Sequence, residues 1–267
     1  MIIVFLILLM AALITYLLTV FGPPISLLII VWAIVGLIGG ILAFLLFFIL
    51  ASFVVKRTKP FGKFKHFIAR QISDFVLLVT RVKIVEVSGK EYLPKSNFVM
   101  YANHKSNTDP FILVSAIRKG VGYAAKSGVY KLPFVKSWLT GIGSININRE
   151  NDREAIKEIL RGIALIEKGA SLGIFPEGGI KSRTNPYMID VKPGAYKLAT
   201  KPGVPILPVA IIGSIDVKDN APWRKTKIKV IIEKPLLKED YENLTTIELG
   251  EIMFKKINKM IEENLPK

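Results

Sequence analysis

The first 55 residues contain no charged side chain, and this constrains the folding of the chain more than any other feature. Residues 2–21 form a predominantly apolar run that, as a helix, is long enough to cross a hydrocarbon core of about 30 Å. A Gly-Pro-Pro sequence at 22–24 interrupts the run, because prolines cannot continue a helix. A second apolar run covers residues 25–55. The pattern predicts an N-terminal hydrophobic two-helix membrane hairpin.

Two alternatives concern this segment. A secretory signal peptide would need a positively charged start and a small-residue cleavage site, and the sequence offers neither convincingly. The hairpin could also span the bilayer or dip into one leaflet, because its tip carries no charge and its second run exceeds a perpendicular span. We therefore expect a membrane-embedded helical hairpin over residues 1–58, spanning or one-leaflet, and a separate domain over residues 59–267.

Charge predicts the partner and the orientation of the chain. The formal net charge is +16, which is typical of proteins that bind nucleic acid or an anionic membrane surface. The apolar N-terminus favours a lipid bilayer as partner and argues against nucleic acid. Basic residues follow the apolar segment directly, and by the positive-inside rule they predict that the domain over residues 59–267 lies on the cytoplasmic face of the cell inner membrane. These residues are Lys56, Arg57, Lys59, Lys63, Lys65 and Arg70.

Composition excludes several kinds of site. The chain has no cysteine, so it can form neither disulfides nor a cysteine nucleophile. Its two histidines, His66 and His104, are too few for a multi-histidine metal centre. We therefore expect no metal site.

From about residue 80 onward, short β-branched runs alternate with helical patterns. Strands are predicted at 83–87, 98–101, 144–147, 171–175, 206–212 and 227–233. Helices are predicted at 110–119, 130–140, 152–168 and 194–201, with a last helix that Thr245 or Thr246 caps and that ends near Asn264. This alternation predicts an α/β fold in which a largely parallel or mixed layered sheet has flanking helices.

A polar loop after the second predicted strand contains the strongest candidate for catalysis. His104 lies in this loop, and an imidazole can accept a proton near neutral pH. If the loop folds back, Asp109 can accept the imidazole Nδ1–H and stabilise the imidazolium. The alternatives are that His104 is structural and that Asp109 caps a helix with Pro110 at its first position. The chain lacks a Gly-x-Ser-x-Gly nucleophile elbow, so a His–Asp pair would activate the hydroxyl of a bound substrate instead.

Four motifs together resemble those of the glycerolipid acyltransferases, in particular the bacterial-type 1-acyl-sn-glycerol-3-phosphate acyltransferases. The first is Asn-His, four residues and Asp at 103–109; the second is Gly-Ser-Ile-Asn-Ile-Asn-Arg at 143–149; the third is Phe-Pro-Glu-Gly at 175–178; the fourth is Val-Pro-Ile-Leu-Pro-Val at 204–209. Each motif alone is weak, whereas four in the same order over residues 98–212 are jointly specific.

The resemblance implies transfer of a fatty acyl group from an acyl thioester to the sn-2 hydroxyl of 1-acyl-sn-glycerol 3-phosphate, giving phosphatidic acid. The thioester is carried by coenzyme A or by acyl carrier protein, and no cofactor is needed. His104 is then the general base and Asp109 its partner. The alternatives are glycerol 3-phosphate or another lysophospholipid as acceptor, and a non-catalytic membrane adaptor.

The same resemblance implies a set of substrate-binding residues. Arg149 is the preferred phosphate anchor, because arginine offers a planar fork of donors, and Lys126 is expected to assist it. Glu177 would accept a hydrogen bond from the glycerol or orient the basic anchors, and Gly178 would form the turn. The family continues its third motif with Thr-Arg-Ser, whereas this chain reads Gly-Ile-Lys-Ser-Arg at 179–183. Arg183 or Lys181 is expected to replace the missing arginine.

Overall fold

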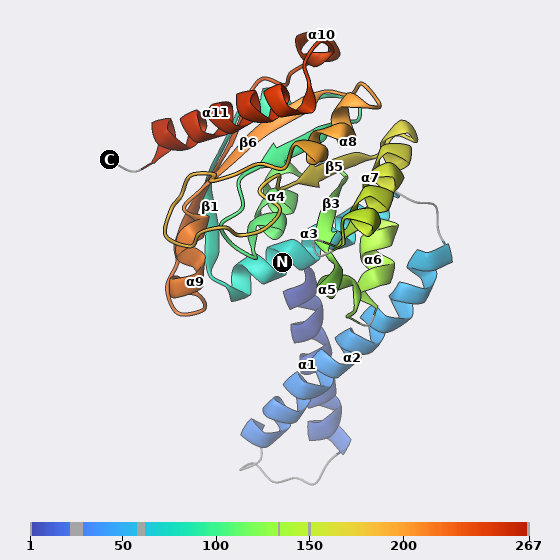
Figure 1. The fold of residues 1–267 in the computed structure, drawn as a ribbon. Coiled ribbons are helices and arrows are strands. Elements are labelled where there is room, and N and C mark those ends of the chain that lie inside the picture. Colours follow the sequence, from blue (N-terminus) through green and yellow to red (C-terminus); the bar gives the residue numbers. More distant parts are fainter. Residues whose placement is uncertain (1, 22–28, 58–61, 133, 149–150, 266–267) are drawn as a thin grey trace. The chain divides into compact units, whose positions relative to one another are not determined.

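The computed structural model describes the whole chain except residues 1, 22–28, 58–61, 133, 149–150 and 266–267 (Figure 1). By its internal contacts, the chain divides into two compact units, Met1–Thr58 and Lys59–Lys267. The predicted hairpin tip lies outside the described residues.

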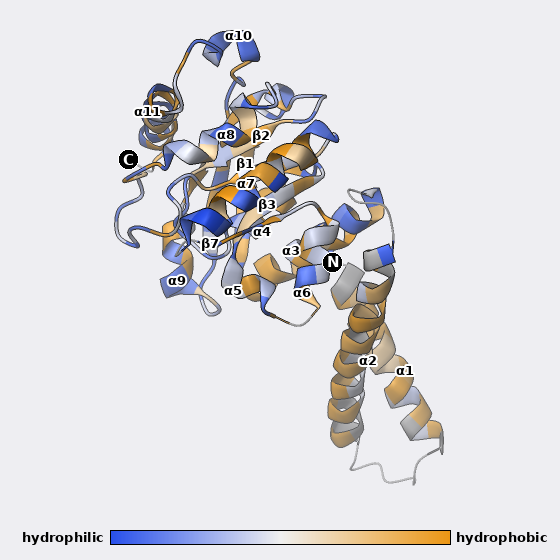
Figure 2. Ribbon diagram, turned by 45° about the vertical axis from the view of Figure 1, so that its right-hand side comes forward, coloured by the Kyte–Doolittle hydropathy of each residue, from blue (hydrophilic) through white to orange (hydrophobic). Residues whose placement is uncertain are grey.

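The first unit consists of α1 (Ile2–Phe21) and α2 (Ile29–Arg57). The two helices approach closely at glycines of α2: a Cβ on Gly40 would lie 2.8 Å from the carbonyl oxygen of Ile7. Figure 2 colours the visible, described parts of both helices predominantly as hydrophobic. Within the described residues, Ile34–Phe53 alone is long and apolar enough to cross a membrane, and the apolar stretch Val4–Leu17 of α1 is shorter. By length and composition, this is weak evidence for membrane association.

The second unit is built on a mixed seven-stranded sheet. Its strands are β1 (Val82–Ser88), β2 (Val99–Ala102), β3 (Val121–Lys126), β4 (Ile145–Ile147), β5 (Ser171–Ile174), β6 (Ile206–Ile212) and β7 (Thr226–Ile232). The spatial order is β1-β7-β6-β2-β5-β3-β4. The pairing of β6 with β7 is antiparallel and the other pairings are parallel, so β1 and β7 run opposite to the remaining five strands.

Helices cover both faces of this sheet, which confirms the α/β class. On one face lie α3 (Lys63–Val79) and α4 (Asp109–Ile117), and on the other lie α7 (Asp152–Glu167), α8 (Lys197–Thr200) and α11 (Thr246–Asn264) (Figure 1). The shorter helical elements are α5 (Ser127–Tyr130), α6 (Val135–Gly141), α9 (Val217–Asn220), α10 (Lys238–Tyr241), η2 (Lys90–Tyr92), η3 (Pro193–Tyr196) and η4 (Ser214–Asp216).

The central strands are buried on both faces, as expected for parallel strands between two helical layers. In β2, Val99 and Tyr101 pack into the core beneath α8 and α11, whereas Met100 packs into the core beneath α4. All seven residues of β6 are buried. A polar site can therefore form only at the ends of these strands.

The six predicted strands are confirmed to within a few residues, but two larger elements were missed, together with the short helical elements α9, α10, η2 and η4. One is β3, which lies between two predicted helices; its sequence Val-Gly-Tyr-Ala-Ala-Lys is poor in β-branched residues. The other is α3, because its basic residues were interpreted as a topology signal. The helix predicted at 130–140 is two short helices, α5 and α6, and the one predicted at 194–201 is η3 followed by α8.

Candidate active site

The carboxyl ends of four neighbouring parallel strands meet at one edge of the sheet, where α/β folds commonly bind ligands. His104 follows β2, Glu177 follows β5, and Lys126 ends β3. Beyond the end of β4, Arg149 lies outside the described residues. The sheet order therefore gathers three motif positions that are up to 73 residues apart in sequence.

His104 and Asp109 are in direct contact. The Nδ1 atom of His104 lies 2.9 Å from Oδ2 of Asp109, whose carboxylate is fully buried. A carboxylate only accepts hydrogen bonds, so Nδ1 carries the proton of the neutral imidazole and Nε2 is left as an acceptor. The ring stacks on Phe175 with centroids 4.2 Å apart, and the His104 side chain is 11% exposed. The predicted fold-back of the loop is thus confirmed.

The same carboxylate shapes the loop. Oδ2 of Asp109 also accepts hydrogen bonds from the amides of Lys105, at 2.7 Å, and Ser106, at 2.8 Å. Helix α4 starts at Asp109, its N-cap is Thr108, and no side chain caps it. The alternative in which Asp109 caps this helix is therefore wrong, because the carboxylate turns back into the loop. Asn103 fixes the start of the loop through two hydrogen bonds to the backbone of Ile211 in β6.

Glu177 is fully buried and its carboxylate is occupied by the protein itself. Oε1 accepts a hydrogen bond from the amide of His104 at 2.9 Å. Oε2 pairs with Nζ of Lys105 at 3.1 Å and accepts from the amide of Ile189 at 3.4 Å. Of the two roles expected for Glu177, this geometry supports orientation of the site rather than contact with the glycerol. Sequence reasoning missed Lys105, whose burial and ion pair appear only in the folded chain.

The turn after Glu177 brings in a further cation that sequence reasoning missed. Gly178 has a φ of 70°, in the left-handed region that favours glycine. A Cβ on Gly178 would lie 2.8 Å from Cε of Lys192, so the lysine stem covers this turn. The amide of Lys192 donates to the carbonyl of Pro176 at 2.8 Å. Its side chain is exposed and makes no ion pair with any described residue. In the sequence, nothing about a lysine before a Pro-Gly pair predicted that Lys192 would pack on Gly178.

The predicted basic residues that the structure describes are exposed. Lys126 stands at the end of β3 and is the N-cap of α5. Arg183 and Lys181 lie in the loop after β5, and in the part of the chain that the structure describes neither side chain contacts the His104–Asp109 pair. The described residues contain no group of three or more His, Cys, Asp or Glu side chains that could hold a metal ion.

Residues 84–212, which contain the His104–Asp109 pair, match the Acyltransferase family model, and this gives the class of the protein. A 1-acyl-sn-glycerol-3-phosphate acyltransferase from Bacillus subtilis is 31% identical over 67% of this chain and 87% of its own length. The chain belongs to the family of 1-acyl-sn-glycerol-3-phosphate acyltransferases, as its four motifs predicted.

One further comparison agrees with this assignment, and another concerns the fold alone. A chloroplastic 1-acyl-sn-glycerol-3-phosphate acyltransferase from Brassica napus is 28% identical over 75% of this chain, and the match spans only 59% of the Brassica protein. The crystal structure of the 1-acyl-sn-glycerophosphate acyltransferase PlsC from Thermotoga maritima has a similar fold, with a TM-score of 0.63 and 23% identity. That similarity covers 81% of this chain and 86% of PlsC.

Proposed function

We propose that the protein transfers a fatty acyl group from an acyl thioester to the sn-2 hydroxyl of 1-acyl-sn-glycerol 3-phosphate, forming phosphatidic acid. The observation that carries the proposal is the His104–Asp109 contact, 2.9 Å long, which leaves Nε2 of His104 as a proton acceptor. Membership of the acyltransferase family supplies the substrate class. The donor is a thioester of coenzyme A or of acyl carrier protein, and no cofactor is required.

In the proposed reaction, Nε2 of His104 takes the proton of the acceptor hydroxyl while the hydroxyl oxygen attacks the thioester carbonyl. Asp109 stabilises the imidazolium that forms. The tetrahedral intermediate collapses, the carbon–sulfur bond breaks, and the thiolate takes the proton from His104. The amide of Gly179 is a candidate donor to the oxyanion, because the neighbouring Gly178 amide already donates to Phe175.

The acceptor phosphate needs cations near this edge of the sheet. We assign this role to Lys192 together with the predicted residues Lys126, Arg149 and Arg183. Lys192 is the strongest replacement for the arginine missing from the third motif, because its stem packs on Gly178, next to the carboxylate that holds the His104 amide. Arg183 and Lys181 remain candidates, and contact with the phosphate would require their loop to close over the substrate.

We also propose that residues 1–58 form a membrane hairpin, spanning or one-leaflet, and that residues 59–267 are the catalytic domain on the cytoplasmic face of the inner membrane. The apolar α1 and α2 and the basic residues that follow them support this arrangement. The acyl tail of the acceptor lies in the bilayer, so an enzyme tethered there meets its substrate at high local concentration.

The test is acyl transfer to 1-acyl-sn-glycerol 3-phosphate in liposomes, comparing the wild type with His104→Ala and Asp109→Asn. We expect His104→Ala to lower kcat about a hundredfold or more, the scale of general-base loss. The matched control Glu262→Gln, an exposed carboxylate on α11, should keep wild-type activity. Equal activity of wild type and His104→Ala would contradict the mechanism. Transfer only to glycerol 3-phosphate or another lysophospholipid would change the acceptor, and lipid binding without transfer would indicate an adaptor.

A further inference from the structure

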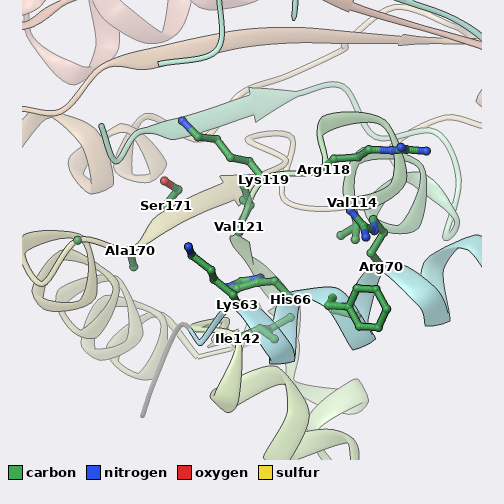
Figure 3. A pocket seen from close by; sticks show the side chains of 14 residues that line it. Lys63, His66, Arg70, Val114, Arg118, Lys119, Val121, Ile142, Ala170 and Ser171 are labelled. Carbon is green, nitrogen blue, oxygen red and sulfur yellow. The ribbon is translucent and has the colours of Figure 1, made fainter. Parts of the chain in front are cut away.

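A second concave site lies in the Lys59–Lys267 unit, apart from His104. It is a pocket of about 380 Å³, within the range of small-molecule sites (Figure 3). Figure 3 shows α3 contributing Lys63, His66 and Arg70, and the segment after α4 contributing Arg118 and Lys119.

The position of the pocket separates it from the candidate active site. Its floor includes Val121 and Ser171, the first residues of β3 and β5, which pair with each other in parallel. His104 and Glu177 instead follow the carboxyl ends of β2 and β5. The pocket therefore lies at the amino ends of these strands, whereas His104 and Glu177 lie at the carboxyl ends. The two sites are at least one strand length, or roughly 10 Å, apart.

The lining of the pocket carries uncompensated positive charge. Lys63, Arg70, Arg118 and Lys119 are cationic at neutral pH, and none of the fourteen lining residues is Asp or Glu. No ion pair among the described residues involves these four cations. Lys119 donates a hydrogen bond to the carbonyl of Pro94, so it is held in place by the protein without being neutralised. Burial lowers the pKa of Lys119, as expected for a cation without a counter-charge.

The local backbone does not require an arginine at position 118. Its backbone has a φ of 54° at the carboxyl end of α4, a position where helices commonly end with glycine. Its side chain is exposed. Glycine would meet the local backbone requirement better, so the side chain of Arg118 has no role in ending α4.

We propose that this pocket binds the phosphate group of an anionic phospholipid headgroup, at a site distinct from that of the proposed reaction. Two arginines can present planar donor forks to phosphate oxygens, and the lysines add charge. A lipid source is favoured over free phosphate because Lys63 stands six positions after Arg57, the end of the apolar α2, and its neighbour Phe64 is 64% exposed. The site would hold the second unit to an anionic leaflet.

The experiment measures binding, without acyl transfer, to the full chain in neutral-detergent micelles. The probe is short-chain phosphatidylglycerol, which lacks the phosphate monoester of the proposed acceptor, and a parallel titration uses inorganic phosphate. We expect Arg70→Gln/Arg118→Gly to weaken phosphatidylglycerol binding by about tenfold or more, the scale of one charged hydrogen bond. The control Lys255→Gln/Lys259→Gln removes the same charge from exposed positions on α11 and should bind as the wild type.

The outcomes separate the alternatives. Unchanged binding of phosphatidylglycerol by the pocket variant, or equal weakening in the control, would overturn the site. Inorganic phosphate that binds as tightly as the lipid, with the same loss in the variant, would overturn the lipid source and identify free phosphate as the ligand. Arg118→Gly alone should retain or raise the melting temperature, because glycine accepts this φ, so weaker binding by that variant cannot reflect unfolding.

Discussion

Two buried carboxylates surround the loop of His104, and they have different tasks. Asp109 contacts the imidazole and two amides of the loop, whereas Glu177 holds the His104 backbone and the buried ammonium of Lys105. Asp109 sets which nitrogen of the His104 imidazole carries the proton, and Glu177 fixes the position of the His104 backbone. Both side chains have no exposed surface, so each carboxylate depends on the hydrogen-bond donors that the protein supplies.

Lys105→Met should therefore destabilise the protein strongly. Removal of the ammonium leaves the buried Glu177 carboxylate without its cation, and the free energy of unfolding should fall by about 3 kcal/mol or more. Denaturant unfolding of the variant measures the loss. In Lys105→Met/Glu177→Gln the unpaired charge is gone, and much of the stability should return. If Lys105→Met were as stable as the wild type, the Lys105–Glu177 ion pair would not stabilise the folded state.

Gly178→Ala tests the turn beside Lys192. Alanine at a φ of 70° is strained by about 1–2 kcal/mol, and its Cβ would displace the Lys192 stem. We expect a higher KM for the phosphate-bearing acceptor in addition to lower stability. Gly203→Ala is the matched control, because Gly203 has a φ of 68° and the atoms nearest its Cβ would be those of the Lys238 stem, outside both proposed sites. An equal KM in the two variants would remove Lys192 from the proposed phosphate site.

For individual residues, the sequence predicted contacts between residues that lie close together along the chain. His104 and Asp109 are five positions apart, and their motif predicted a contact that one loop can make. Lys105 was missed because its partner Glu177 follows a different strand, and Lys192 was missed because it packs on Gly178, 14 positions earlier in the same connection (192 − 178). Charge and spacing along the chain carry no information about such partners.

Among the helices, α11 has the clearest terminal signal. Thr245 accepts a hydrogen bond from the amide of Glu248, and the Glu248 carboxylate accepts from the amide of Thr245, a reciprocal capping box. Its buried face contributes Leu249, Met253 and Ile257 to the core. The sequence predicted this helix with Thr245 or Thr246 as its cap, and the structure has Thr245 there. Where local signals conflict, as in β3 with its glycine and alanines, tertiary pairing decides.

Thr245→Ala should lower the free energy of unfolding by about 1 kcal/mol at neutral pH, because it removes the cap. Hydrogen bonds from Thr245 lower the pKa of Glu248, so the folded state favours the ionised carboxylate. This contribution is present above the ordinary pKa of a glutamate and is lost as pH falls through the lowered value. Denaturant unfolding at neutral and acidic pH should show a smaller difference between wild type and variant in acid. A difference that grows on acidification would contradict this cap.

On the scale of the whole molecule, the two compact units allow membrane attachment and catalysis to be separated. The Lys59–Lys267 unit has core clusters on both faces of its sheet, so we expect it to fold without residues 1–57. The truncated chain should act on a short-chain soluble acceptor like the full chain. On liposomes its activity should fall by about a hundredfold, the lower end of the gain expected from tethering. Full activity of the truncation on liposomes would show that the N-terminal unit is dispensable.

The pairing of β1 with β7 has a consequence for synthesis of the protein. Val82 pairs with Thr226, 144 positions later (226 − 82), and β1 is the edge strand of the sheet. At translation rates of about 5–20 residues per second, β1 leaves the ribosome roughly 7–30 seconds before its partner exists. During that interval the apolar segment has already emerged and can enter the bilayer. The apolar segment is therefore exposed by the ribosome before the sheet can be completed, and early chaperone protection should matter most for the unpaired residues of β1.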